Sequence, residues 1–336
     1  MDVAASGLGP ADLREARTRI ARAARVTPLV PSQLLSDRFG HPVALKCENL
    51  QAGGAFKIRG ASNFVARLDD AGRARGLITY SSGNHAIAVS LTARRAGCPA
   101  VIVMPETAPA LKKTRVRDLG AELHFAGTTS IERKTRAEAI CAERNLTMVP
   151  PFDHPHIVQG QSTCGTELVE QSPEVGVVLV PVGGGGLLAG VALACAYHRP
   201  GIRVIGVEPQ GAAKMSSSLR AQAPITLPSV GSIADGLLPS RPGDLTFAIA
   251  QQFVETVVTV PDDAIAEAAR LLLRDDHLLV EWSGAVGLAA LLTGAVRPGG
   301  AATVLVLSGG NAEPADLLAG PGGLRRTGPV PGSGSG

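Results

Sequence analysis

"VPVGGGGLLAGVALA", residues 180–194, is the stretch that decides the fold of this chain. Apolar residues continue up to Val182, as in a strand that is buried on both faces. Four consecutive glycines follow, and an apolar helical segment comes after them. Strand, glycine turn and helix in this order are typical of a parallel α/β fold. Because the turn lacks side chains, its N–H groups can converge on a phosphate at the helix N-terminus.

The rest of the chain repeats this alternation of strands and helices. Short runs rich in Val, Ile and Leu predict strands at 43–50, 76–82, 100–105, 121–127, 175–184, 203–209, 254–260 and 303–310. Helical patterns lie between them, for example at 83–97 and 262–276. The alternation predicts mostly parallel sheets flanked by helices. Eight strands would also suit a barrel, but the long irregular stretch 209–250 disfavours one.

Composition excludes several classes of function. The 336 residues carry a net charge of only +3 without a basic block, and one Trp and two Tyr give few stacking surfaces, so we expect no nucleic-acid partner. Apolar runs end well short of the roughly 20 residues of a membrane span, so we expect no membrane partner. Residues 320–336 are rich in Gly, Pro and Ser, which predicts a flexible tail.

Cysteine usage and the N-terminal pattern bear on the compartment. Five cysteines are present, an odd number, and none forms a CxxC pair. Neither a disulfide framework nor a zinc site is therefore expected. The first 20 residues show no basic segment followed by an apolar core, so no signal peptide is predicted. Together these features favour the cytoplasm.

Two further glycine turns and one lysine add to the glycine loop. "SSGNH" (81–85) and "SGGN" (308–311) also follow predicted strands, where ligands of open α/β sheets bind. In "GGAFKIRGASN" (53–63), Lys57 follows the glycine pair Gly53 and Gly54, which would let the backbone approach a planar ligand. An amine beside a phosphate cradle can bond covalently to pyridoxal phosphate (PLP). A lone lysine opening a helix would more simply be solvated.

The glycine loop also fits a different cofactor. Gly184, Gly186 and Ala189 match the G-x-G-x-x-G/A pattern of dinucleotide-binding folds, and Glu208 follows about 20 residues later at a strand end. This pattern alone indicates an NAD-dependent oxidoreductase. That interpretation leaves Lys57 and the "SSGNH" turn without a role.

The motifs taken together resemble one enzyme family. "GAFKIRGASN", "SSGNHAIA", "VGGGGLLAG", "GVEP", "IADGL" and "LSGGN" look like fold-type II PLP enzymes, in the serine/threonine dehydratase and serine racemase group. The resemblance covers roughly residues 15–318. It implies a tryptophan synthase β-like α/β fold with a large domain (1–72 and 153–319), a small mobile domain (73–152) and a homodimer.

The resemblance also assigns the cofactor-binding positions. Lys57 would hold PLP covalently and then act as the base at Cα of the substrate. Phe56 would pack on the ring, Asn84 would bind its phenolic oxygen, Glu281 would lie next to it and Ser308 would face its ring nitrogen. The phosphate would bind at Gly183, Gly184, Gly185, Gly186 and Leu187. A serine hydroxyl at the ring nitrogen leaves it largely neutral, which favours β-elimination or racemisation over transamination.

The substrate positions leave two activities open. Ser81, Ser82, Gly83 and His85 lie in the turn that binds the α-carboxylate in relatives. Ser82 occupies the place of the acid that protonates Cα in racemases, whereas Phe152 is typical of dehydratases. Arg133 aligns with an arginine that meets a distal carboxylate, although a solvated helix arginine is the simpler interpretation. We expect loss of water from a β-hydroxy amino acid such as threonine, serine or a specialised 3-hydroxy amino acid, giving a 2-oxo acid and ammonia.

Three positions depart from the pattern that the resemblance implies. Metal-binding members use two acids and a carbonyl here; Glu208 and Ala212 match, but Lys214 stands in place of the second acid. Because an ammonium repels a hard cation, we expect no metal, with Lys214 supplying the charge instead. Trp282 replaces a usual proline, and "DGLLPSRPG" (235–243) departs from the usual substrate loop. These differences favour a specialised substrate over threonine.

Overall fold

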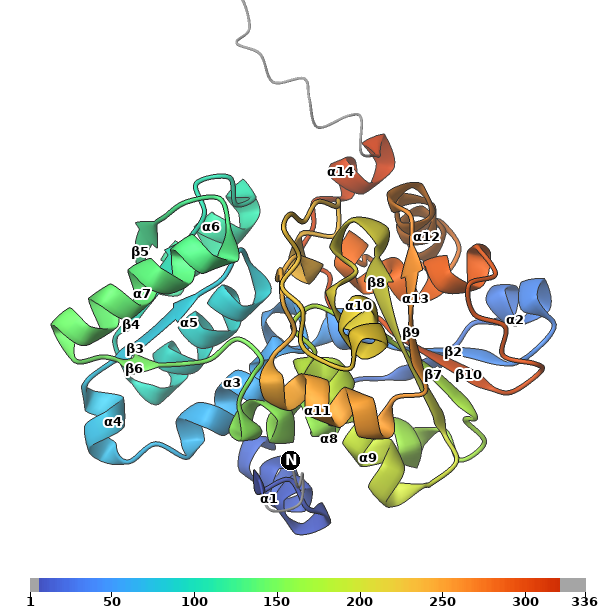
Figure 1. The fold of residues 1–336 in the computed structure, drawn as a ribbon, viewed down its shortest axis with the longest axis horizontal. Helices are drawn as coiled ribbons and strands as arrows, with labels where there is room; N and C mark the ends of the chain where they lie inside the picture. Colours follow the sequence, from blue (N-terminus) through green and yellow to red (C-terminus); the bar gives the residue numbers. More distant parts are fainter. Residues whose placement is uncertain (1–5, 321–336) are drawn as a thin grey trace, which may run out of the picture.

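The computed structural model describes residues 6–320. They form two α/β units, each built around its own sheet of mostly parallel strands (Figure 1). The larger sheet has the order β1-β2-β10-β7-β8-β9 and is parallel except for β1, which runs antiparallel to β2. Its strands are β1 (Leu29–Pro31), β2 (Val43–Lys46), β7 (Val177–Pro181), β8 (Arg203–Pro209), β9 (Thr256–Val260) and β10 (Thr303–Val306).

The smaller sheet is parallel throughout and has the order β5-β4-β3-β6. Its strands are β3 (Leu77–Tyr80), β4 (Ala100–Met104), β5 (Glu122–Phe125) and β6 (Thr147–Met148). All eight predicted strands form, and the predicted α/β class is confirmed. The prediction missed β1 and β6, which are three and two residues long and therefore show little periodicity.

Helices cover both faces of the two sheets. They are α1 (Pro10–Ile20), α2 (Gln33–Phe39), α3 (Lys57–Ala66), α4 (Asp70–Ala74), α5 (Asn84–Ala96), α6 (Ala110–Asp118), α7 (Ser130–Arg144), α8 (Pro155–Gln171), α9 (Gly186–His198), α10 (Lys214–Ala221), α11 (Asp244–Phe253), α12 (Asp262–Arg274), α13 (Trp282–Leu292) and α14 (Pro314–Ala319). Short 3₁₀ turns lie at η2 (Glu48–Leu50), η3 (Ala52–Gly54), η4 (Gln210–Ala212) and η5 (Asp235–Leu237).

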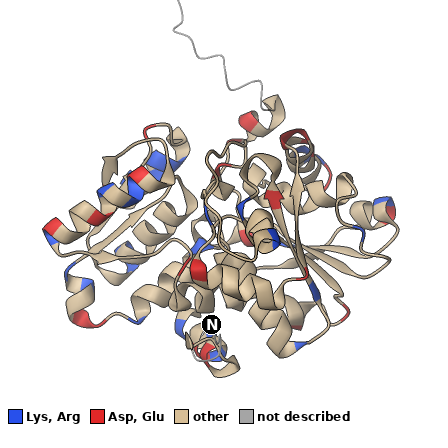
Figure 2. Ribbon diagram, in the orientation of Figure 1, with Lys and Arg blue, Asp and Glu red and all other residues tan. Residues whose placement is uncertain are grey.

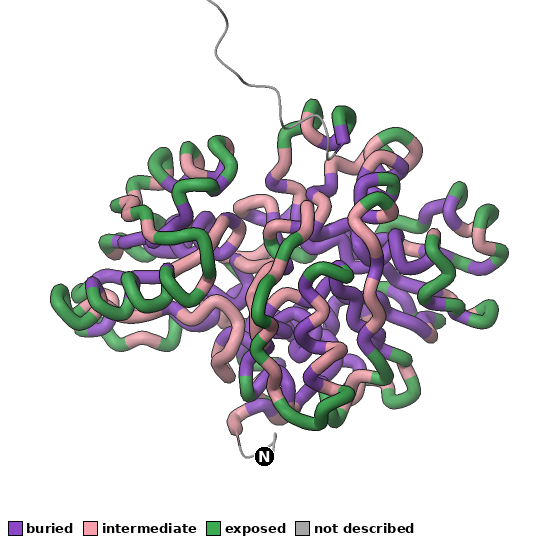
Figure 3. The backbone as a smooth tube through the Cα atoms, turned by 45° about the horizontal axis from the view of Figure 1, so that its top comes forward, coloured by how far each residue is buried: buried purple, intermediate pink, exposed green. Residues whose placement is uncertain are grey.

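Strand β7 explains why the runs of Val and Leu are unbroken. Val177 and Leu179 pack against the cluster that includes α12 and α13, whereas Val178 and Val180 pack against α8 and α9. Because successive strand residues point to opposite faces, both faces need apolar side chains. Buried residues therefore fill the middle of each unit and exposed ones lie on the outer helices (Figure 3).

Charged residues are distributed in the same way as exposed residues. Lys, Arg, Asp and Glu mark the helices and loops far more than the strands, and both signs are interspersed (Figure 2). No helix among residues 6–320 has the length and apolar character needed to cross a membrane. The predicted tail, 320–336, lies outside the described residues except for Gly320.

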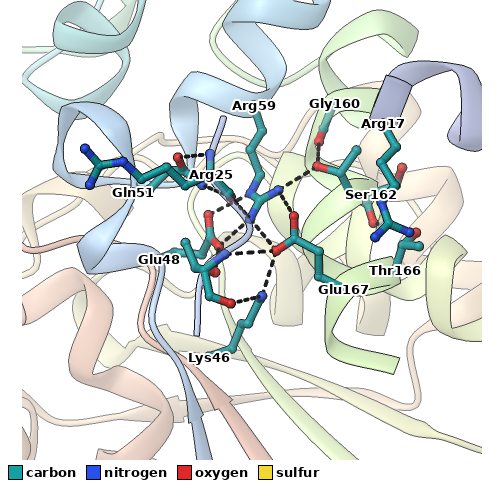
Figure 4. A network of polar contacts seen from close by, with 12 residues as sticks. Arg17, Arg25, Lys46, Glu48, Gln51, Arg59, Gly160, Ser162, Thr166 and Glu167 are labelled. Carbon is teal, nitrogen blue, oxygen red and sulfur yellow. Dashed lines mark hydrogen bonds and ion pairs between the residues drawn. The ribbon is translucent and has the colours of Figure 1, made fainter. Parts of the chain in front are cut away.

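A buried ionic network anchors α3 to the large sheet (Figure 4). The guanidinium of Arg59 donates to Glu48 on η2 at 2.8 Å and to Glu167 on α8 at 2.7 and 2.8 Å. Lys46 on β2 donates to the same Glu167 at 2.7 Å and to the carbonyl of Thr27 at 2.8 Å. Arg59 lies two residues after Lys57, so this network sets the position of the helix that begins with Lys57.

Candidate active site

A cavity of about 380 Å³ lies where the turns after β3, β7 and β10 converge with the start of α3. Its wall brings together nearly every residue that the sequence singled out. These are Phe56, Lys57, Ser81, Ser82, Asn84, His85, Arg133, Phe152, Gly183, Gly184, Gly185, Gly186, Leu187, Glu281 and Ser308. Gly83 is the exception: a β-carbon there would meet the side chain of Lys112, which forms the wall at that point.

Lys57 lies at the first position of α3, at the cavity wall. Its Nζ donates to the carbonyl of Pro151 at 2.7 Å and lies 5.2 Å from the centre of the Phe56 ring. The surrounding protein disfavours the charged form, so burial lowers the pKa of Lys57 to about 8. An amine with this pKa is partly neutral near physiological pH and can act as a nucleophile or a base.

The glycine pair before Lys57 has the backbone geometry that only glycine adopts easily. Gly53 and Gly54 have φ of +77° and +75°. A β-carbon on Gly54 would overlap the amide of Asn311, which donates to the carbonyl of Gly53 at 2.9 Å. The pair therefore turns the chain tightly into α3 beside the "SGGN" turn.

The glycine loop after β7 is a set of unpaired backbone donors. The N–H groups of Gly183, Gly184, Gly185, Gly186 and Leu187 donate to no acceptor among the described residues. Gly185 has φ of +99°, and a β-carbon on Gly184 would overlap the ring of Phe152. Free N–H groups at the start of α9, facing a cavity, match what a phosphate requires. The loop therefore fits the phosphate of PLP.

The turn before α5 is a second group of donors. Ser81 Oγ accepts from the N–H of Gly83 at 3.1 Å, while the N–H groups of Ser82, Asn84 and His85 donate to no described residue. His85 Nε2 lies 3.2 Å from the carbonyl of Val149 and so carries the hydrogen of this contact. Burial and the neighbouring Lys57 lower the pKa of His85 to about 3, which keeps the ring neutral. This turn can hold a carboxylate through N–H groups.

Polar groups of both units meet at Asn84. Its amide donates to Glu281 and accepts from Asn311 at 2.8 Å. Lys112 on α6 pairs with Glu281 at 3.2 Å and with Asp235 on η5 at 2.7 Å. Burial raises the pKa of Glu281, and Lys112 opposes that rise. Burial lowers the pKa of Lys112, but Glu281 and Asp235 outweigh it and leave the pKa raised.

Sequence reasoning missed Lys112 and Asp235. Lys112 and Lys113 are adjacent in a basic helix, and nothing in the sequence says which of them faces inward. Asp235 stands in the "IADGL" motif, so its place in a recognisable motif was the one available signal.

Arg133 corrects one expectation. Its side chain on α7 is buried with 9% of the residue exposed, so the interpretation as a solvated helix arginine is wrong. The guanidinium lines the cavity and donates to the carbonyl of Thr128 at 3.2 Å, while its Nε has no partner among the described residues. No described carboxylate forms an ion pair with it. Burial lowers the pKa of Arg133. A buried, unpaired guanidinium favours an anionic ligand.

Glu208 has a role that the dinucleotide interpretation does not allow. It is fully buried, outside the cavity wall, and both its carboxylate oxygens accept backbone N–H groups at the start of α10. Lys214 pairs with it at 3.0 Å. Glu208 therefore lies away from the cavity and is not available to the ribose of a dinucleotide there. Among residues 6–320, no group of three or more His, Cys, Asp or Glu side chains could hold a metal ion.

Comparison with known proteins agrees with the fit of this cavity to PLP. The family described as "Pyridoxal-phosphate dependent enzyme" matches residues 20–309. The chain belongs to this family. The match includes the glycine loop and Glu208, so the alternative of an NAD-dependent oxidoreductase is wrong for this chain.

The relatives of this PLP-dependent enzyme include lyases and racemases. The L-threonine ammonia-lyase of Geobacter sulfurreducens is 42% identical, over 90% of this chain and 75% of the relative. The L-threo-3-hydroxyaspartate ammonia-lyase of Saccharomyces cerevisiae is 37% identical, over 90% and 93%. The solved structure of maize serine racemase has a TM-score of 0.87 at 38% identity, over 91% of this chain and 94% of that one.

Proposed function

We propose that the protein is a PLP-dependent ammonia-lyase that removes water from a β-hydroxy amino acid and yields a 2-oxo acid and ammonia. The observation that carries the proposal is the pairing, in one cavity, of a lysine of lowered pKa with a loop of free N–H groups. The lyases among its relatives support elimination.

The same residues would hold the cofactor. Gly183, Gly184, Gly185, Gly186 and Leu187 would bind the phosphate, and Lys57, Phe56, Asn84, Glu281 and Ser308 would surround the ring. When bound, PLP supplies an aldehyde that links covalently to amines and a ring that accepts the electrons left at Cα. Ser308, whose carbonyl accepts from the N–H of Phe56 at 3.1 Å, would bring its hydroxyl to the ring nitrogen.

Different groups of the protein would then bind the substrate and remove its proton. The N–H groups of Ser82, Asn84 and His85 would bind the α-carboxylate, since they are free and lie at the positive end of α5. Lys57 would take the proton from Cα, which its lowered pKa permits near neutral pH. The hydroxyl at Cβ would then take up a proton, which Lys57 can return, and leave as water, and hydrolysis would release the nitrogen as ammonia. Phe152, packed on Gly184, would close one side of the substrate space.

Arg133 supports a narrower substrate class. Its guanidinium lines the cavity without a carboxylate partner among the described residues, so a substrate with a second carboxylate would satisfy it. We therefore propose a 3-hydroxyaspartate-type substrate, in line with the yeast relative. Racemisation or epimerisation is the second candidate because Ser82 also lines the cavity.

A panel of β-hydroxy amino acids tests these proposals. Ammonia and 2-oxo acid would be measured for threonine, serine and each 3-hydroxyaspartate isomer, with chiral chromatography to detect racemisation. Lys57→Ala should lower kcat by about 10²–10⁴, the usual loss with a catalytic base. Arg133→Met should raise KM for hydroxyaspartate by about 10- to 100-fold, as for a lost hydrogen bond to a charged group, with little change for threonine.

Arg136→Met is the matched control, since Arg136 is an exposed arginine on the same helix. Equal activity of Lys57→Ala and the parent would refute the lyase mechanism. Unchanged discrimination in Arg133→Met would refute only the substrate class. Conversion of one isomer to another without ammonia would favour the racemase.

Three further properties are also our proposals. The resemblance supports a homodimer, which light scattering tests, and a small mobile domain at 73–152. The odd number of cysteines without CxxC pairs supports a cytoplasmic location.

A further inference from the structure

Helix α10 begins with a lysine whose amino group lies inside the protein. Lys214 is fully buried, and its Nζ contacts four oxygen atoms. Three are the carbonyls of Val182 at 2.8 Å, Leu237 at 3.0 Å and Ala212 at 3.1 Å. The fourth is Oε1 of Glu208 at 3.0 Å.

These contacts require a cation at this point. A neutral amine has two N–H groups and a lone pair, which would face an oxygen that can only accept. An ammonium has three N–H groups and a positive charge that attracts all four oxygens. Burial lowers the pKa of Lys214, but Glu208 opposes this shift. Backbone carbonyls and a carboxylate are also the ligands that Mg²⁺ and Ca²⁺ prefer, so the amino group occupies a pocket suited to a hard cation.

The four oxygens come from segments that shape the active site. Val182 immediately precedes the glycine loop, and Leu237 ends η5, the turn that begins with Asp235. A β-carbon on Gly183 would already touch the carbonyl of Gly236, at 3.1 Å. The ammonium therefore ties the base of the glycine loop to η5 and, through Glu208, to the start of α10.

We propose that Lys214 is a built-in counterpart of a metal ion: its ammonium holds the glycine loop and η5 in register and makes cofactor binding independent of divalent cations. Lys214 is a positioning residue, since it reaches the cavity only through Val182 and Leu237. An ordinary buried ion pair would also stabilise the fold. Only a cation pocket, however, would accept a replacement ion once the lysine is removed.

Three variants separate these two roles. Lys214→Met keeps the length of the side chain but not its charge, Lys214→Asp turns the pocket into two acids and three carbonyls, and Glu208→Gln with Lys214→Asp removes one acid again. The dissociation constant for PLP would be measured by absorbance titration, and Tm by circular dichroism. Each would be recorded in a chelator and in millimolar Mg²⁺ or Ca²⁺. Lys113→Met on α6 serves as a lysine control.

We expect the parent and Lys113→Met to be indifferent to chelator and cation. Lys214→Met should bind PLP at least about tenfold more weakly, with no effect of either ion. Lys214→Asp should be as weak in chelator but return to within about threefold of the parent in Mg²⁺ or Ca²⁺, with a higher Tm, because an ion that binds the folded state stabilises it. The double variant should lose this recovery.

Several outcomes would overturn the proposal. One is a parent protein whose PLP affinity falls in chelator, and another is a Lys214→Met variant with parental PLP affinity. A third is a folded Lys214→Asp variant that ignores both ions. If Lys214→Asp folds only with an ion, the proposal is supported; if it folds under neither condition, Lys214→Met decides. None of these measurements needs turnover, so their failure leaves the lyase proposal intact.

Discussion

At the scale of single residues, the reactivity of the site comes from where one amine lies. Lys57 differs from the solvated lysines of the chain only in its surroundings: the wall of the cavity, the ring of Phe56 and one carbonyl acceptor. With a pKa of about 8, about one such amine in ten is neutral at pH 7, against about one in 3,000 for an ordinary lysine.

This difference predicts the pH dependence of cofactor capture. Only the neutral amine can attack the aldehyde of PLP, so the rate of covalent attachment to the cofactor-free protein should rise with pH. It should level off just above pH 8 instead of continuing to about 10.5. Stopped-flow absorbance measures this rate, and mass spectrometry after borohydride reduction shows whether Lys57 carries the cofactor. A rate that still rises steeply between pH 9 and 10 would contradict the lowered pKa.

At the scale of elements, two features position α3: the network of charged side chains around Arg59, and the glycine pair that precedes the helix. Arg59 is fully buried between Glu48 and Glu167, whose carboxylates come from η2 and α8 (Figure 4). Its planar fork satisfies both, which a lysine ammonium could not do. The register of α3, and hence the direction of Lys57, depends on this anchor.

Arg59→Met should therefore cost about 3–5 kcal/mol in the free energy of unfolding, because it leaves buried carboxylates without their cation. Arg59→Lys should recover only part of this loss. Urea unfolding followed by circular dichroism gives the values. Arg67→Met, at the exposed end of the same helix, is the control and should stay within about 0.5 kcal/mol of the parent. A cost for Arg59→Met no larger than the control's would show that the network does not stabilise the fold.

At the scale of the whole molecule, the two units meet across the cavity through Lys112. This lysine belongs to the smaller unit, whereas its partners Asp235 and Glu281 belong to the larger one. The contact closes the cavity on the side of the "SSGNH" turn, since Lys112 also packs on Gly83. Motion of the smaller unit would have to break this ion pair.

Lys112→Met should loosen the smaller unit more than the larger one. It leaves Glu281 without its cation, and we expect a local cost of about 2–3 kcal/mol because Asp235 is partly exposed. Hydrogen exchange should become about 30- to 150-fold faster for amides of 77–148, with β7 and β10 little changed. Lys113→Met is the neighbouring control. Equal acceleration in both sheets would show that 73–152 is not an independent domain.

The sequence by itself predicted eight of the ten strands in the described residues and most of the cavity wall. Unbroken Val and Leu runs predicted the parallel strands because a strand covered on both faces needs apolar residues at every position. Glycines marked the turns because only glycine adopts the positive φ of Gly53 and Gly185 without strain. Parallel strands place their carboxyl ends at one edge, so three such turns and Lys57 were expected to converge.

Tertiary structure alone decided which charges face inward and which partners they find. Arg133 and Arg136 lie on one helix and differ in sequence by nothing that marks the first as buried. Lys112 is distinguished from Lys113 only by Asp235 and Glu281, which are more than 100 residues away in the chain. The environment of Lys214 depends on carbonyls from three separate segments. Local sequence patterns indicate secondary-structure propensity and burial. The role of a charged side chain depends on its neighbours, and only folding brings those neighbours close.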